Sequence, residues 1–389
     1  MSVIGIIAEF NPLHSGHEYL ISEAKKQGTV VAVISGNFVQ RGETAIAEKR
    51  LRAEAALRCG VDLVLEMPVL WSMSTAENFA LHGVYALKNI GCTKIMFGSE
   101  CGNTDILNKT ADILLSDEFS SNVSKLMADG ITFAAARERA AIICGADTDI
   151  LSKPNNNLAI EYIKAAKQQG FDIEFETVKR KGADHDSYTE AEYVSASLLR
   201  EKLRLADYDF CRKYMSDNAL SLFTPDAVSD TERTDRAVLA VLRTKTPEEL
   251  KKLPDISEGV ENKLFNAIKL AESLPDLYNR IKVKRYTLAR IRRLVLSAFI
   301  GADNSFFMKP PPYIRVLGFN KTGEQQLRAG AKGSSVPIIA RPADIKNSDS
   351  AALKVFETEC RATDLFGLSL AKPLPCGLEY TAKIIKTEC

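Results

Sequence analysis

The chain has 389 residues, of which 46% are hydrophobic and 26% charged, and its formal net charge is +1. This composition is typical of a globular protein of two or three domains and excludes disordered, collagen-like and coiled-coil classes. No apolar run approaches the roughly 18 residues of a membrane span, and the N-terminus lacks the basic start of a signal peptide. The small net charge argues against a protein that binds polyanions over its whole surface.

The charge is divided unevenly between the two halves of the chain. Residues 1–210 contain 22 Lys+Arg and 29 Asp+Glu, a net of −7, whereas residues 211–389 contain 29 and 21, a net of +8. Such asymmetry indicates nucleic-acid contact by the basic half. We therefore predict two regions, an acidic domain over residues 1–210 and a basic region over residues 211–389 that contacts nucleic acid.

The eight cysteines are scattered, and none forms a C-x-x-C pair. The four histidines do not lie near them at ligand spacing, so a zinc site is not expected. Single thiols without a signal peptide fit a reducing compartment, and we expect a cytoplasmic protein.

The first 200 residues alternate short apolar runs with helical stretches. Strands are predicted at residues 3–9, 29–35, 62–66, 94–97 and 171–178, and helices at 47–59, 75–89, 104–142, 157–168 and 196–205. This alternation predicts an α/β fold, a Rossmann-like parallel sheet with helices on both faces. Ligands of such sheets bind beyond the carboxyl ends of the strands, so chemistry is expected in the loops that follow Ile7, Ile34, Leu65 and Phe97.

Beyond residue 210 the pattern becomes mostly helical. Helices are predicted at residues 233–243, 247–252, 260–274 and 288–299. A proline run at 310–312 ends this region, and a small α/β tail follows, with strands predicted at 314–317 and 336–339.

His14-Ser15-Gly16-His17 follows the first predicted strand and opens the first helix. This H-x-G-H pattern resembles that of the nucleotidylyl transferases. Free N–H groups and the dipole of a helix N-terminus bind phosphate, and Gly16 lets a nucleotide approach closely. Two imidazoles three residues apart can both donate to an α-phosphate as its charge builds, so His14 and His17 are the predicted catalytic residues. A chance pair of histidines is the alternative, which the position directly after a strand disfavours.

Residues 195–200, with the sequence S-A-S-L-L-R, stand at a predicted loop-to-helix junction. They resemble the I-S-[ST]-T-x-I-R type of signature that binds the triphosphate in many nucleotidylyl transferases. Serines at a helix start can bind phosphate, and Arg200 can pair with an oxyanion. A plain helix cap with a surface arginine explains the pattern equally well.

Four other polar segments lie at the predicted ligand edge of the sheet: residues 35–43, 98–100, 154–157 and 179–181. The first is a candidate for binding an acyl substrate or a base, and the second for close backbone approach to adenine or ribose. The asparagines of the third could contact the nucleotide, and the basic cluster of the fourth could hold phosphates. Each segment also has a purely structural alternative. In the same order, these are a solvated connector, a turn at a strand end, a helix cap and an exposed run of charges.

Together, several segments resemble the bacterial tRNA(Met) cytidine acetate ligases over nearly the full chain; these are residues 4–17, 35–43, 97–100, 151–156, 179–186, 284–287 and 313–318. The resemblance implies that ATP activates acetate to acetyl-adenylate, which then acetylates N4 of the wobble cytidine in elongator tRNA(Met) without coenzyme A. It also implies an ATP site made of Ile7, Ala8, Glu9, Phe10, Asn11, Pro12, Leu13, His14, Ser15, Gly16, His17, Gly98, Asn155, Arg180 and Lys181. Segment 179–186 is one residue shorter than the family pattern, which leaves the phosphate partner open among Lys179, Arg180 and Lys181.

The implied reaction has two steps. Acetate attacks the α-phosphate of ATP and pyrophosphate leaves, with Mg²⁺ expected to neutralise the pyrophosphate. The weakly nucleophilic cytidine amine then displaces AMP, so positioning should dominate that step, and the base must leave the anticodon stack.

Residues 282–293 contain six basic side chains and no Asp or Glu. We predict that this segment binds tRNA phosphates and that tRNA affinity is therefore salt-sensitive. The predicted tRNA-binding residues are Lys282, Lys284, Arg285, Arg290 and Arg293. A solvated helix face is the alternative. The resemblance implies that residues 1–210 form the catalytic domain and that residues 211–389 form a mostly helical tRNA-binding region.

Two other functions remain open at this point. The chain could be another adenylyltransferase or acid-activating synthetase of the same superfamily, which the large basic C-terminal region argues against. It could also be a tRNA-binding protein that senses a nucleotide without catalysis, which the intact pair of His14 and His17 argues against.

Overall fold

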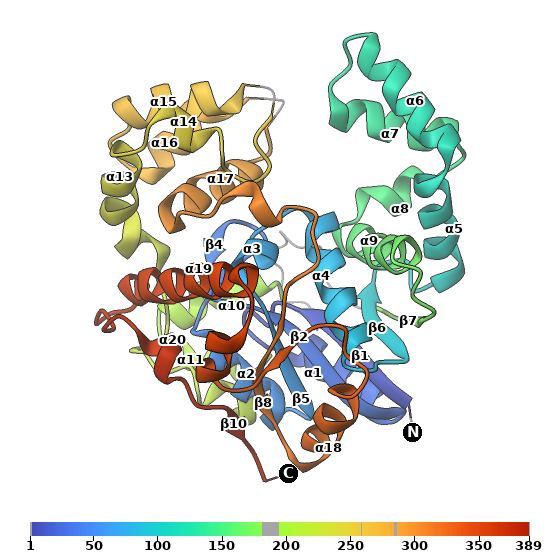
Figure 1. The fold of residues 1–389 in the computed structure, drawn as a ribbon, viewed down its shortest axis with the longest axis vertical. Helices are drawn as coiled ribbons and strands as arrows, with labels where there is room; N and C mark the ends of the chain where they lie inside the picture. The colour runs from blue at the N-terminus through green and yellow to red at the C-terminus, as the bar shows by residue number, and fades with distance from the viewer. Residues whose placement is uncertain (1, 181–193, 258, 284–285, 389) are drawn as a thin grey trace.

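The computed structural model describes residues 2–180, 194–257, 259–283 and 286–388 (Figure 1). Its centre is a sheet with the strand order β10-β8-β5-β2-β1-β6-β7, in which β8 runs antiparallel to β5 and every other pair is parallel. A further strand, β9 (Ile338–Ile339), pairs with β8. The mostly parallel sheet confirms the predicted fold class. Its strands are β1 (Ser2–Ala8), β2 (Gly28–Ser35), β5 (Leu63–Met67), β6 (Lys94–Ser99), β7 (Glu174–Lys179), β8 (Ile314–Phe319) and β10 (Ile385–Lys386).

The strands are apolar runs because both faces of the sheet are covered by helices. In β1, Ile4 and Ile6 join one hydrophobic core while Val3 and Ile7 join the other. The first core includes residues of α1 (Ser15–Lys25), α2 (Lys49–Arg58) and α10 (Ala196–Arg204). The second includes residues of α4 (Ala76–Asn89), α9 (Pro154–Gln168) and α19 (Ser350–Phe366).

Two groups of helices stand on opposite sides above the sheet in Figure 1. One, the helical arm, is inserted between β6 and β7 and consists of α5 (Thr104–Leu115), α6 (Asp117–Ala128), α7 (Phe133–Ile143) and α8 (Thr148–Ser152). The stretch predicted as one helical region is broken at Ser116, whose hydroxyl accepts from the N–H of Phe119 and so starts a new helix.

The other group, the helical unit, packs around a third apolar core, which Phe38 and Phe366 from outside the unit also join. It consists of α13 (Asp235–Arg243), α14 (Pro247–Leu250), α15 (Val260–Leu270), α16 (Leu274–Ile281) and α17 (Leu288–Ile300). Each of the four helices predicted beyond residue 210 lies within this unit. The predicted third helix, residues 260–274, ends earlier than expected, and Ser273 caps a separate helix, α16.

The second half of the chain also supplies parts of the sheet region. Strands β8 and β10 pair there, and α18 (Lys321–Gly330) packs beside β5. Further short helices are α3 (Val69–Ser72), α11 (Tyr208–Cys211), α12 (Asp217–Leu220) and α20 (Leu378–Thr381). The predicted division of function at residue 210 remains a prediction. The fold does not divide at that position, because residues after 313 form strands of the same central sheet.

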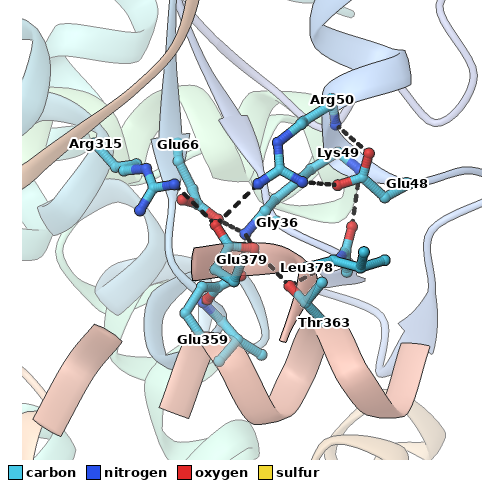
Figure 2. A network of polar contacts seen from close by, with 12 residues as sticks. Gly36, Glu48, Lys49, Arg50, Glu66, Arg315, Glu359, Thr363, Leu378 and Glu379 are labelled. Carbon is cyan, nitrogen blue, oxygen red and sulfur yellow. Dashed lines mark hydrogen bonds and ion pairs between the residues drawn. The ribbon is translucent and has the colours of Figure 1, made fainter. Parts of the chain in front are cut away.

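A buried ionic network joins the two halves (Figure 2). The ammonium of Lys49 on α2 contacts the carboxylates of Glu66, Glu359 and Glu379, the last two at 2.9 and 3.0 Å. Arg315 of β8 also pairs with Glu379, at 3.0 Å. Burial raises the pKa of Glu66 to about 8. Burial also disfavours the charged form of Glu379, but the positive charges of Lys49, Arg315 and Arg50 outweigh this effect and lower the pKa of Glu379 to about 2. The network fixes α19 and α20 against α2 and the sheet.

None of the described helices combines the length and apolarity that crossing a membrane requires. The cysteines in the described chain are free thiols, and His, Cys, Asp and Glu form no group of three or more there that could hold a metal ion.

Candidate active site

A cavity of about 800 Å³ opens at the carboxyl ends of β1, β6 and β7. Segments that the sequence singled out line much of it: the end of β1 with the start of α1, the segment after β2, the end of β6, the start of α9, the end of β7 and the start of α10. The loop that follows β5 is absent from the lining, and Glu66 of that strand belongs to the buried network instead. The fold thus brings most of the predicted loops to one place, as the sheet rule requires.

The two histidines of the H-x-G-H segment lie against each other, with ring centroids 3.9 Å apart. His14 is the N-cap of α1, and its Nδ1 accepts from the N–H of Gly16 at 3.1 Å, which assigns the ring proton to Nε2. Nδ1 of His17 is buried and has no hydrogen-bond partner among the described residues. Burial, His14 and Arg180 lower the pKa of His17 well below its usual value. His17 is therefore a neutral imidazole that can serve as a hydrogen-bond donor.

The loop between β1 and α1 is held by buried arginines. Arg52 Nη1 donates to the carbonyl of Glu9 at 2.6 Å, and Arg200 Nη1 donates to the carbonyl of Asn11 at 3.0 Å. The side chain of Asn11 accepts from the N–H of Ile46 at 2.7 Å. These contacts fix the loop before a ligand arrives, as an active site requires.

Three residues of the predicted ATP stretch lie outside the cavity lining. Pro12 and Leu13 are buried, and the N–H of Ser15 donates to the carbonyl of Tyr214 at 2.7 Å. These residues support the loop on the side away from the cavity. The sequence pattern could not distinguish supporting residues from residues that line the cavity. The members of the stretch that do line the cavity are Ile7, Ala8, Glu9, Phe10, Asn11, His14, Gly16 and His17.

The segment after β2 is a small antiparallel hairpin of β3 (Phe38–Val39) and β4 (Glu43–Thr44) instead of an open loop. Its residues Gln40, Arg41 and Glu43 line the cavity. The N–H of Gln40 donates to Oε1 of Glu9 at 3.0 Å. Burial raises the pKa of Glu9, against the opposing effects of this hydrogen bond and of nearby arginines.

The end of β6 is tied to the start of α9 by Glu100. Its carboxylate accepts from the side-chain amide of Asn155 at 2.7 Å and from the N–H of Asn156 at 2.8 Å. Gly98 faces Arg180: a Cβ at this glycine would lie 3.3 Å from Cγ of that arginine. Both Asn155 and Arg180 line the cavity, as does Lys179. Lys181, the third candidate phosphate partner, lies outside the described residues, as does most of segment 179–186.

The start of α10 has the predicted helix cap but not the predicted surface arginine, and phosphate binding by the S-A-S-L-L-R segment stays a prediction. Ser195 caps the helix by accepting from the N–H of Leu198 at 3.3 Å, and it also lines the cavity. Arg200 is buried instead of exposed on the surface, and its Nη2 donates to the hydroxyl of Ser197 at 3.1 Å. This arginine thus joins the loop that carries the histidines to the cavity wall.

Aromatic side chains from helix interiors complete the cavity, and the sequence reading missed them. Phe79 of α4 and Tyr162 of α9 line it, and the hydroxyl of Tyr162 donates to the carbonyl of Ile7 at 3.5 Å. Aromatic residues at helical spacing are typical of a hydrophobic core, so no local signal marks them as part of a site.

Among the predicted tRNA-binding residues, Lys282 directly follows α16, and Arg290 and Arg293 lie on α17. Lys282 is exposed, whereas Lys284 and Arg285 lie outside the described residues. The side chains of Arg290 and Arg293 are only 16% and 14% exposed, because both pair with Asp255, at 3.5 and 3.3 Å. The alternative of a solvated helix face is therefore wrong for these two arginines, and contact of the segment with tRNA stays a prediction.

The fold and the cavity define a class of protein: an α/β nucleotide-binding protein with a histidine pair at a helix N-terminus and cationic side chains around it. The chain matches the HIGH Nucleotidyl Transferase family over residues 1–376. It is 37% identical to the tRNA(Met) cytidine acetate ligase of Thermoanaerobacter sp. (strain X514), and the alignment covers 99% of this chain and 100% of that protein. With the ligase of the same name from Caldanaerobacter subterraneus subsp. tengcongensis the identity is 38%, at the same coverage.

Solved structures agree with these matches. The crystal structure of Thermotoga maritima TmcAL bound with alpha-thio ATP has a TM-score of 0.91 and 28% identity to this chain, with 100% of both chains covered. The apo form of the same protein has a TM-score of 0.93 and 29% identity, at the same coverage. The chain belongs to the tRNA(Met) cytidine acetate ligase family within the HIGH nucleotidyl transferases, which confirms the resemblance noted in its sequence.

Proposed function

We propose that this protein is an ATP-dependent ligase that activates acetate to acetyl-adenylate and acetylates N4 of the wobble cytidine in elongator tRNA(Met), releasing AMP and pyrophosphate. The observation that carries the proposal is the pair of His14 and His17 at the start of α1, in one cavity with Lys179 and Arg180. Family membership supplies the acceptor, because the aligned relatives are named for it.

In the first step, an acetate oxygen attacks the α-phosphorus of ATP, and the bond to the bridging oxygen breaks as pyrophosphate leaves. The Nε2–H of His14 and the imidazole of His17 donate to the α-phosphate oxygens, whose charge grows in the transition state. Lys179 and Arg180, at the end of β7, attract the triphosphate to the cavity. Mg²⁺ enters with the triphosphate as part of the substrate.

In the second step, the N4 amine attacks the acetyl carbonyl carbon, loses a proton, and displaces AMP. The cytosine leaves the anticodon stack to reach the cavity. Because the amine is weakly nucleophilic, the walls of the cavity contribute mainly by orienting it toward the mixed anhydride. Both steps use soluble substrates of the cytoplasm, where we place the protein.

The tRNA body lies against the basic segment 282–293 of the helical unit. Lys282 is exposed and available for a phosphate contact. Reversing the charges of Arg290 and Arg293 together tests the role predicted for those two. We expect weaker tRNA binding, and unchanged tRNA affinity would contradict that role.

One assay tests the overall function. The protein is incubated with ATP, labelled acetate and a transcript of elongator tRNA(Met), and both AMP release and label in the tRNA are measured. We expect both signals, each dependent on acetate. AMP release without labelled tRNA would indicate another acid-activating enzyme of the superfamily, and neither signal would indicate a protein that binds tRNA without catalysis.

A further inference from the structure

The β3–β4 hairpin lies between the active-site cavity and the helical unit. One side of it lines the cavity through Gln40, Arg41 and Glu43. Its turn packs directly on α17: Gly42 has a φ of +71°, and a Cβ there would lie 2.6 Å from Cβ of Arg292. The turn thus needs glycine both for its backbone conformation and for this close approach.

Two arginines of α17 bind the hairpin. Nη1 of Arg292 donates to a carboxylate oxygen of Glu43, and Nη1 of Arg293 donates to the carbonyl of Gln40 at 3.3 Å. The second arginine is itself fixed by Asp255, which accepts from its Nη2 at 3.3 Å. Hydrogen bonds between charged groups in such partly buried places are stronger than surface ion pairs.

The hairpin in turn contacts the loop that carries the histidines. The N–H of Gln40 donates to Glu9, which lies at the start of that loop. Glu43 is 3.8 Å from Arg200, whose other nitrogen donates to the carbonyl of Asn11. A continuous path of polar contacts therefore leads from α17 to the segment that ends at His14.

We propose that Arg292 and Arg293 are positioning residues for the adenylation of acetate, because through the hairpin they fix Glu9 and Arg200 at the cavity. The helical unit then serves two purposes. It binds tRNA, and it also supports the first chemical step, for which it is needed even when no tRNA is present. This inference rests on the proposed function. Displacement of a reacting group by about 1 Å can cost 10²-fold in rate, so a loosened hairpin should be visible in kinetics.

The test is acetate-dependent exchange of labelled pyrophosphate into ATP, measured without tRNA on the full-length protein. Arg292→Ala should lower kcat of the exchange by about tenfold or more, with the affinity for a tRNA(Met) transcript unchanged. Arg292→Lys should recover part of the loss, because it restores the charge but not the planar donor geometry. Gly42→Ala, which pushes the turn away from α17, should lower the exchange independently.

Arg280→Ala is the matched control. This arginine belongs to the same helical unit, but it pairs with Asp276 on its own helix, at 2.8 Å. It should leave the exchange rate and the tRNA affinity unchanged. Glu43→Ala and Arg292→Ala together should lower the exchange by less than the product of their separate effects, since both break the same contact, although Glu43→Ala also removes the contact with Arg200.

Three results would overturn the inference. Wild-type exchange in Arg292→Ala, Arg292→Lys and Gly42→Ala, with melting temperatures showing folded proteins, would exclude a positioning role. Loss of tRNA affinity with normal exchange would make Arg292 a tRNA contact. A wild-type protein without acetate-dependent exchange would refute the proposed function itself, and with it this inference.

Discussion

His14 and His17 are the residues at which sequence and structure agree most directly. Their motif is local, so its spacing and its position directly after the first strand predicted that they would open a helix, whereas the phosphate site that they face stays a prediction. The spacing could not predict the tautomer of His14 or the protonation state of His17. The hydrogen bond from Gly16 directs the Nδ1 lone pair of His14 away from the cavity, and burial keeps His17 neutral.

Replacing either histidine by asparagine should lower acetate-dependent pyrophosphate exchange by about 10²–10³-fold, the typical cost of losing one donor to a transition-state oxyanion. ATP affinity, measured by equilibrium dialysis, should change far less, because both rings act chiefly on charge that develops during the reaction. A variant that loses ATP affinity in proportion to its rate would make the histidine a ground-state ligand instead.

The ionisation of His17 gives a pH prediction. Because its pKa is lowered well below 6.5, the free protein should keep this ring neutral as the pH falls through 6.5, where an exposed histidine gains its proton. Bound ATP should raise the pKa, since a phosphate stabilises the imidazolium. NMR titration of the ring carbons, assigned with His17→Asn, measures both effects. A ring that titrates near 6.5 in the free protein would contradict the burial argument.

At the scale of elements, the apolar runs predicted the central strands well, because strands covered on both faces are continuous hydrophobic segments. The hairpin after β2 was missed, since its two strands are two residues each and its contacts are distant in sequence. Glu43 and Arg292 are 249 positions apart. Tyr162 was missed for a similar reason. Its helix has the sequence pattern of an ordinary core helix, and only the folded structure shows the cavity beside it.

The buried network around Lys49 predicts a large stability effect. Lys49→Met removes the ammonium that pairs with the buried carboxylates of Glu359 and Glu379, which leaves uncompensated charge in the interior. The free energy of unfolding should fall by about 3–5 kcal/mol, measured by urea denaturation at pH 7. Arg58→Met is the matched control, because its pair with Glu54 lies at the surface, with side chains 40% and 32% exposed, and should contribute at most about 1 kcal/mol. Equal effects of both substitutions would contradict the role of the network.

At the scale of the whole molecule, the net charge of +1 conceals two flanks of opposite sign. Residues 211–310, which contain the helical unit, hold 18 Lys+Arg and 13 Asp+Glu, a net of +5. Residues 101–150, most of the helical arm, hold 4 and 8, a net of −4. The two groups stand on opposite sides above the sheet (Figure 1). A polyanion is therefore attracted to one flank and repelled by the other, which favours one direction of approach for tRNA.

This asymmetry is testable with two exposed lysines. Lys282→Glu in the helical unit should weaken tRNA binding several-fold and reduce the slope of log affinity against log salt by about 1, because one phosphate contact is lost. Lys125 is also exposed and lies on α6 in the acidic arm, so Lys125→Glu is the matched control and should change neither quantity. Filter binding between 50 and 200 mM KCl measures both. Pyrophosphate exchange should be unaffected in both variants, since neither lysine lines the cavity. If Lys125→Glu weakened tRNA binding as much as Lys282→Glu does, the tRNA would lie across both flanks, and charge alone would not set its direction of approach.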